Sequence, residues 1–314
     1  MKAWKLSVGT AGAIGLRKLK TDALPTTAYV MLGEKCLRNC AFCAQAREST
    51  AAAKYLSRVA WQETAEAIAV EAIKKAYSQG LICRACLQIV NRPDSLDVVR
   101  AAVRELVASH VPVVVSGYIT SVAEAGQLFG LGVSRIGLAM DVATPELFAR
   151  IKGGSWQERW ALLCACAEAY PGCMTTHLIV GLGETEAEML AIIKECIRRQ
   201  ITVGLFAFTP VKGTVMGTCA PPPLAVYRRL QMARALLLGG VMPEQLVCGA
   251  DGKISFRGIA YQELLADGTA FRTSGCEGCN RPFYNERPGH VLYNYPRALT
   301  EQEIQQAFVE SEAE

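Results

Sequence analysis

The chain has 314 residues, of which 51% are hydrophobic and 20% charged. Such a chain is too long and too apolar to be disordered, and it can bury one large core of the α/β-barrel kind. Its net charge of +4 comes from 33 basic and 29 acidic residues spread along the sequence, so we expect no nucleic acid and no membrane surface as a partner. No run approaches the ~18 apolar residues that a membrane-spanning helix needs.

From Thr26 onward, short apolar runs alternate with amphipathic stretches, as expected when parallel strands are joined by helices. The expected strands are Ala28–Leu32, Ile82–Val90, Val111–Ser116, Arg135–Met140, Thr175–Val180 and Val203–Phe208. The expected helices include Trp61–Ser78, Ser95–Ser109, Trp156–Ala169, Glu186–Arg199 and Ala225–Leu238.

Six βα units predict an α/β fold of the TIM type, as a three-quarter barrel or, if the segment from Val241 adds strands, a full one. We expect an N-terminal extension (1–25), a (βα) barrel core (26–240) and a C-terminal region (241–314) that completes the barrel or covers it as a lid. This C-terminal extension contains cysteines, in the segment Phe271–Pro296. Ligands of such a barrel bind at the carboxyl ends of the strands.

Thirteen cysteines could form disulfides, but several are spaced as C-x-x-C or C-x-x-x-C. In an intracellular protein this spacing indicates metal ligation, so we expect a reducing, cytoplasmic setting.

Cys36, Cys40 and Cys43 form a C-x-x-x-C-x-x-C loop directly after the first expected strand. Three thiolates with this spacing can hold three corners of a 4Fe-4S cluster and leave the fourth iron open. The open iron can chelate S-adenosylmethionine, whose reductive cleavage gives a 5′-deoxyadenosyl radical. The alternative is a zinc site or three structural thiols, although zinc usually takes four ligands.

The segment GEKCLRNCAFCAQA, with Phe42 before the third cysteine, resembles the cluster loop of the radical S-adenosylmethionine superfamily, and most of all its biotin synthase branch. Other segments resemble that branch from about Thr26 to Leu238. The resemblance implies that Cys36, Cys40 and Cys43 are the catalytic cluster ligands and that Phe42 lies at the cofactor.

The same resemblance implies which residues hold the nucleotide. In GLAMDVATPELFARIKG it assigns Asp141 to the ribose hydroxyls, and in SWQERW it assigns Arg159 to the carboxylate of the methionine moiety. The alternative for Arg159 is an ordinary exposed helical arginine. In HLIVGLGETEAE, Gly181 and Gly183 would let the backbone approach adenine.

The segment CLQIVNRPDS stands where the superfamily often has Gly-Gly-Glu beside the methionine amino group. Asn91 and its neighbours are closer to the biotin synthase pattern, so Asn91 is a candidate cofactor residue. Which atoms bind the amino group stays open.

Two C-x-x-C pairs, Cys83 with Cys86 and Cys276 with Cys279, are far apart in sequence, and we expect both at the open, carboxyl end of the barrel. They are candidate ligands of an auxiliary iron-sulfur cluster. Cys83 should face away from Cys86 if their strand is regular. A structural zinc is the alternative.

The tail TSGCEGCNRPFYNERPG resembles one component of the two-protein lipoyl synthases of archaea and some anaerobic bacteria. This resemblance implies a sulfurtransferase that inserts sulfur from an auxiliary cluster into a protein-bound octanoyl chain. It also implies three partners: a homologous radical S-adenosylmethionine protein, an octanoylated carrier domain (an H protein or the lipoyl domain of an acyltransferase), and an electron donor such as ferredoxin or flavodoxin.

Two other functions stay open. One is biotin synthase or another biotin synthase-like radical enzyme, although we do not find the later-strand cysteines that biotin synthase uses for its auxiliary cluster. The other is a non-catalytic metal-binding protein or sulfur carrier. The three histidines are expected to be structural, although His177 could point into the barrel.

Overall fold

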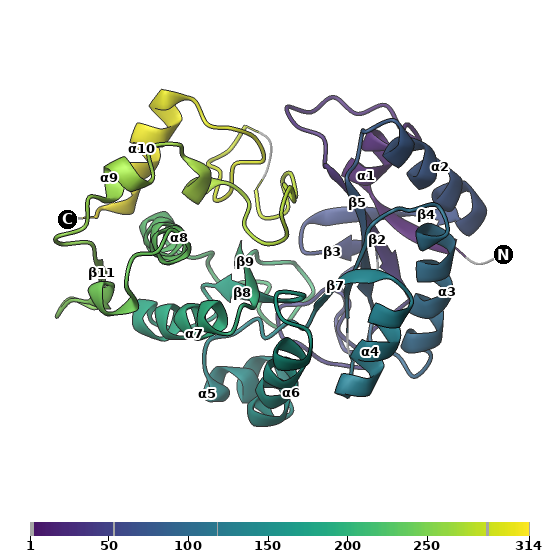
Figure 1. The fold of residues 1–314 in the computed structure, drawn as a ribbon, viewed down its shortest axis with the longest axis horizontal. Coiled ribbons are helices and arrows are strands. Elements are labelled where there is room, and N and C mark those ends of the chain that lie inside the picture. The colour runs from purple at the N-terminus through teal and green to yellow at the C-terminus, as the bar shows by residue number, and fades with distance from the viewer. Residues whose placement is uncertain (1–2, 53, 118, 287–288, 314) are drawn as a thin grey trace.

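The computed structural model describes residues 3–52, 54–117, 119–286 and 289–313. A curled, nine-stranded sheet in the order β3-β4-β1-β2-β5-β6-β7-β8-β9 forms its centre (Figure 1). Its parallel strands are β2 (Thr27–Leu32), β5 (Arg84–Ile89), β6 (Val113–Ser116), β7 (Val133–Gly137), β8 (Met174–Val180) and β9 (Thr202–Ala207). The predicted α/β partial barrel is therefore confirmed.

Helices cover the outer face of this sheet, and α3 shows the amphipathic pattern that places one apolar face against it. In α3 the buried residues Val99, Ala102, Val103 and Leu106 recur at helical spacing, and α7 begins with a capping box between Thr185 and Glu188. The covering helices are α2 (Glu66–Ser78), α3 (Ser95–Val107), α4 (Val122–Gly130), α6 (Trp156–Ala169), α7 (Glu186–Arg198) and α8 (Leu224–Leu238).

One edge of the sheet is antiparallel and was not expected. It consists of β1 (Ala3–Ser7), β4 (Val59–Ala65) and β3 (Tyr55–Leu56), with the short helix α1 (Val8–Ala13) after β1. The expected helix Trp61–Ser78 is therefore wrong at its start: residues from Trp61 to Ala65 pair with β1, and the helix begins at Glu66. Pairing with a distant strand overrides the local pattern.

The barrel stays open beyond β9. The strands β10 (Val247–Cys248) and β11 (Ile254–Ser255) pair only with each other, so within the described residues the C-terminal region adds no strand to the main sheet. The full eightfold barrel is thus not formed.

The remaining short elements are α5 (Pro145–Leu147), η1 (Phe148–Lys152), η2 (Pro243–Gln245), α9 (Tyr261–Leu264), η3 (Thr269–Phe271) and α10 (Glu301–Ser311).

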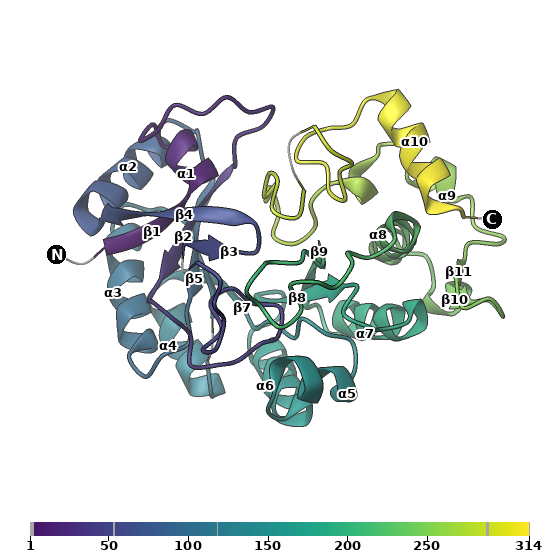
Figure 2. The same cartoon turned by 180° about the vertical axis from the view of Figure 1, so that it is seen from behind.

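The C-terminal segment lies across this opening. The Leu205 N–H of β9 donates to Ser274 Oγ at 2.7 Å, and the Thr26 N–H, just before β2, donates to Asn280 Oδ1 at 3.0 Å. Figures 1 and 2 show these C-terminal loops between β9 and the N-terminal strands. Residues 274–280 therefore span the gap between the two ends of the parallel sheet.

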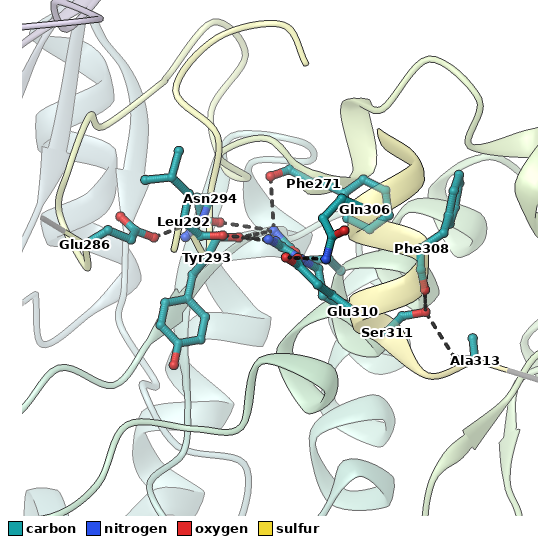
Figure 3. A network of polar contacts seen from close by, with 12 residues as sticks. Phe271, Glu286, Leu292, Tyr293, Asn294, Gln306, Phe308, Glu310, Ser311 and Ala313 are labelled. Carbon is teal, nitrogen blue, oxygen red and sulfur yellow. Dashed lines mark hydrogen bonds and ion pairs between the residues drawn. The ribbon is translucent and has the colours of Figure 1, made fainter. Parts of the chain in front are cut away.

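Buried arginines of α8 anchor this segment to the barrel. Arg228 donates hydrogen bonds to the carbonyl oxygens of Leu292 (2.6 Å) and Tyr293 (2.7 Å) and to Glu310 of α10 (3.0 Å). Figure 3 shows these three partners, from the tail and from α10, gathered at one point. Arg229, next to Arg228 on α8, pairs with Glu186 of α7 and donates to the Ser311 carbonyl oxygen.

The described residues contain no helix that is both long enough and apolar enough to cross a membrane.

Replacing Arg228 with Met should lower the free energy of unfolding by about 3–5 kcal/mol, because the Glu310 carboxylate and two carbonyl oxygens lose their donor in a buried site. Urea denaturation of the two proteins measures the difference. The matched control is Arg104→Met on the exposed face of α3, which should change stability by less than about 0.5 kcal/mol. An equal effect of both variants would contradict the anchoring role.

Candidate active site

The three-cysteine loop follows the carboxyl end of β2, and contacts with two other segments hold it in place. The Leu37 N–H donates to the Asn91 carbonyl oxygen (2.9 Å), the Ala41 N–H to that of Ile151 (2.8 Å), and the Cys43 N–H to that of Cys40 (3.0 Å). Arg38 reaches across to the Gly153 carbonyl oxygen at 2.6 Å. The loop is thus fixed to the ends of β5 and η1.

A cavity of about 290 Å³ lies at the carboxyl ends of the strands, where barrel enzymes bind their ligands. The structure brings most of the expected cluster and nucleotide residues to its wall. Those that line it are Cys36, Phe42, Cys40, Cys43, Asn91, Asp141 and Arg159. Arg159 lies on α6 and donates to the Ile119 carbonyl oxygen (3.1 Å), so its guanidinium points toward the barrel.

The three thiols form a suitable donor set for an iron-sulfur cluster. Burial raises the pKa of the Cys40 thiol and raises that of Cys43 to about 12, so neither is a free thiolate at neutral pH. A bound metal supplies the positive charge that makes the thiolate form favourable. Within the described residues, no group of three or more His, Cys, Asp or Glu side chains is already arranged around a single metal ion.

A buried ion pair in the cavity wall was missed in the sequence. Lys152 Nζ lies 2.6 Å from Asp141 Oδ2, with 7% and 13% of the two side chains exposed, and it also donates to the Ala139 carbonyl oxygen at 2.6 Å. Lys152 ends the π-helical turn η1, a type of turn that is frequent at functional sites. Neither the spacing nor the hydrophobic pattern singles out this lysine, because a turn and the short elements α5 and η1 bring it back to Asp141.

Asp141 itself is held in an unusual backbone conformation. Its φ is +65°, in the left-handed region that residues other than glycine seldom adopt, and its backbone bridges to β8 through the Asp141 N–H to His177 O bond (2.8 Å). Strained residues of this kind cluster at functional sites. Lys152 and the β8 backbone together fix the position of this carboxylate.

Gly181 and Gly183 follow β8 but do not line the cavity. Both have positive φ, 99° and 112°, and the Glu184 carboxylate accepts hydrogen bonds from the Gly181 (2.6 Å) and Leu182 (2.9 Å) N–H groups. A Cβ at Gly181 would lie 2.9 Å from the Pro222 ring. The structure thus gives this turn a local packing role, and contact with adenine stays a prediction.

The floor of the cavity includes residues that we had not assigned to the site. Tyr284 and Asn285 come from the C-terminal tail, where the Tyr284 hydroxyl accepts from Gln88 (3.1 Å) and Asn285 donates to the Ala207 carbonyl oxygen (2.7 Å). His177 does point into the cavity, stacked edge-on against Phe206. Burial lowers the pKa of His177 to about 4, so its imidazole is neutral.

The two C-x-x-C pairs do meet, but at the opposite end of the barrel from the end we expected. Cys83 lies just before β5 and donates to the carbonyl oxygen of Thr26, which precedes β2. A Cβ on Gly278 would lie 3.7 Å from Cys83 Sγ. The loop Cys276–Cys279 therefore lies at the amino ends of these strands, because the tail enters the barrel gap from that side.

Cys86 and Cys279 lie deeper in the barrel than Cys83. Cys86 is in the middle of β5, and Cys279 Sγ is 3.0 Å from the hydroxyl of Tyr29, the residue opposite Cys86 on β2. Burial raises the pKa of both Cys86 and Cys276. Cys83 precedes β5, so the alternation of side chains along a regular strand does not apply to it, and its orientation relative to Cys86 stays a prediction.

A partial (βα) barrel with three cysteines after its first parallel strand defines a class of iron-sulfur radical enzymes. The family model of the radical SAM superfamily matches residues 30–196, more than half of the chain. The protein therefore belongs to the radical SAM superfamily. This family implies a 4Fe-4S cluster and S-adenosylmethionine as cofactors.

Solved structures support the fold. Methylornithine synthase (PylB) is similar with a TM-score of 0.56 and 15% identity over 90% of this chain and 81% of that one. The FeFe-hydrogenase maturase HydG from Carboxydothermus hydrogenoformans gives a TM-score of 0.51 and 17% identity, over 68% of this chain and 50% of the maturase. The chain thus spans about half the length of that maturase. A search of curated proteins gives no match.

Replacing Cys43 with Ala should lower the iron content of the anaerobically reconstituted protein by about four per chain, because the cluster loses one of only three ligands. Cleavage of S-adenosylmethionine should fall below detection. Iron analysis and chromatography of 5′-deoxyadenosine measure the two effects. The control is Cys219→Ala, an exposed cysteine that does not line the cavity, and unchanged iron in the Cys43 variant would contradict the assignment.

Replacing Lys152 with Met should weaken S-adenosylmethionine binding at least tenfold, because the Asp141 carboxylate loses its fixed position, and should lower stability by about 3–5 kcal/mol. Lys152→Arg should retain part of the S-adenosylmethionine affinity and part of the stability. Equilibrium dialysis of the reconstituted protein and urea denaturation measure these effects. Lys75→Met, on the exposed face of α2, is the matched control, and wild-type affinity in Lys152→Met would contradict the role.

Proposed function

We propose that this protein is a radical S-adenosylmethionine sulfurtransferase that inserts sulfur into a protein-bound octanoyl chain to make the lipoyl group, acting with a homologous partner protein. One observation carries the proposal: two separate sets of cysteines lie in the same barrel and are joined by one short segment. The residues 274–285 contain Cys276 and Cys279 at one end and the cavity residues Tyr284 and Asn285 at the other.

The β5 strand joins the two sites in the same way. Cys86 lies two residues before Gln88, which lines the cavity and donates to Tyr284. The aromatic pair Tyr29 and Tyr284, with ring centres 5.8 Å apart, packs between the two sites. A reaction that needs both a radical and a second metal centre requires such proximity.

Cys36, Cys40 and Cys43 would hold the 4Fe-4S cluster, and Cys86, Cys276 and Cys279, with Cys83 beside them, would hold the auxiliary cluster. When bound, the first cluster with S-adenosylmethionine supplies a radical able to abstract hydrogen from an unactivated carbon, and the auxiliary cluster supplies sulfur. Asp141, fixed by Lys152, would orient the ribose, and Arg159 would pair with the methionine carboxylate.

The cavity suits an alkyl substrate on chemical grounds. Met31, Ile179 and Phe206 contribute apolar surface to its wall. Among the described wall residues, His177 is neutral because burial holds its pKa near 4, so it adds no charge to those of Arg38, Asp141, Lys152 and Arg159. The apolar side chains of Met31, Ile179 and Phe206 would exclude water from the carbon that reacts.

The partners follow from the proposed reaction. An octanoylated carrier domain, an H protein or the lipoyl domain of an acyltransferase, would bring the substrate to the cavity, and ferredoxin or flavodoxin would supply electrons. The homologous radical S-adenosylmethionine protein would complete the reaction.

The test reconstitutes the protein anaerobically and measures iron per chain, 5′-deoxyadenosine and sulfur in an octanoylated peptide, with and without the peptide. We expect about eight irons per chain and cleavage that the peptide stimulates. About four irons with peptide-independent cleavage would leave a biotin synthase-like or other small-molecule radical enzyme. No cleavage at all would leave a metal-binding or sulfur-carrier protein.

The double variant Cys86→Ser and Cys279→Ser separates the two sites. It should lose about four irons and all sulfur transfer but keep the cleavage of S-adenosylmethionine, because the three-cysteine loop is intact. The matched control is Cys164→Ser with Cys219→Ser, which changes two cysteines outside both sites. Sulfur transfer by the Cys86 and Cys279 variant would overturn the proposed role of the second site.

A further inference from the structure

A second cavity, of about 310 Å³, lies at the amino end of the barrel, next to the loop that carries Cys276. It is bounded by the start of β9, the end of α7, the outer end of α8 and the tail residues Gly275 and Glu277. Its rim includes the exposed residues Gln200, Leu238 and Glu277, so it opens to solvent. It shares no lining residue with the three-cysteine cavity.

Two arginines line this cavity and are held by the backbone around it. Arg135 Nη1 donates to the Gly172 carbonyl oxygen (2.7 Å) and to Thr202 Oγ1 (3.1 Å), and Arg234 Nε donates to the Val203 carbonyl oxygen (3.1 Å). These contacts fix the two guanidinium groups with only part of their N–H groups used. A guanidinium has five such donors.

Neither guanidinium has a counter-charge among the residues that the structure describes. Within the described ranges no carboxylate forms an ion pair with Arg135 or Arg234, and no hydrogen bond is made by Nη1 or Nη2 of Arg234. Both side chains are half-buried. Burying a charged group without a partner is unfavourable, and burial lowers the pKa of Arg234 to about 10.

The other charges around the cavity leave it positive. Among the described lining residues, Glu277 is the one acidic residue and is exposed at the rim, against two arginines. Behind Gly275 lies a third guanidinium, because a Cβ on Gly275 would come within 3.9 Å of Arg281 Nη1. Gly275 has a φ of +121°, so the wall at this point is bare backbone.

We propose that this cavity is a binding site for a small oxyanion, a carboxylate or an inorganic phosphate or sulfate, held between Arg135 and Arg234 beside Cys276. Planar guanidinium groups match the oxygens of such anions in pairs of hydrogen bonds. The volume, at the lower limit of small-molecule pockets, fits a small anion. Because the site lies at the other end of the barrel from the three-cysteine cavity, both can be occupied together. The proposal does not depend on the proposed sulfur transfer.

The test titrates inorganic phosphate and, separately, malonate into the 314-residue chain by calorimetry, at constant ionic strength maintained with chloride. We expect saturable binding of at least one anion at one site per chain. The tighter of the two identifies the ligand as an inorganic oxyanion or a carboxylate. Absence of saturable binding by both would overturn the proposal.

Variants that lower or raise the positive charge of the cavity test whether the anion binds there. Arg135→Gln should weaken binding at least tenfold, and Glu277→Gln, which removes the one acidic group of the rim, should strengthen it about twofold to fivefold. Leu238→Asp adds a negative charge at an exposed rim position, where the substitution should not disturb the core, and it should weaken anion binding. This variant keeps the test decisive if an arginine variant fails to fold. The matched control is Arg104→Gln on the exposed face of α3. Wild-type affinity in both Arg135→Gln and Leu238→Asp would overturn the site.

Discussion

The open edge of the partial barrel is the constraint on which the rest of the structure depends. The sheet stops at β9, whose outer N–H groups would otherwise be left without partners next to the barrel interior. The C-terminal tail meets this need, as in the hydrogen bond from Leu205 to Ser274, and the buried arginines of α8 hold the tail in place. Residues from the end of the chain therefore become part of the barrel interior.

The path of the tail explains why the cysteine sites lie at both the amino and the carboxyl ends of the strands. The tail enters at the amino ends of the strands with Cys276 and Cys279 and reaches the carboxyl ends with Tyr284 and Asn285. A single segment thus contributes to two cysteine sites and, through Gly275 and Glu277, to the arginine-lined cavity. Moving the tail would alter all three.

Both ends of the barrel carry positively charged side chains, but in different settings. At the carboxyl end, Lys152 is paired with Asp141 and the imidazole of His177 is uncharged, while Arg38 and Arg159 add positive charge to the same wall. At the amino end, no carboxylate within the described residues forms an ion pair with Arg135 or Arg234. A buried charge that the protein leaves unmatched favours a ligand of the opposite sign.

The sequence by itself determined the βα order, the six parallel strands and the three-cysteine loop, because hydrophobic periodicity and short spacings are local properties. The family resemblance of its segments also pointed to Asp141, Arg159 and Asn91, which line the cavity and whose roles stay predictions. Only the tertiary structure decided that Trp61 lies in a strand, that Lys152 pairs with Asp141, and that the second cysteine pair meets the first at the amino end. Each of these depends on contacts between segments far apart in the chain or on the path of an irregular tail, which no local pattern encodes.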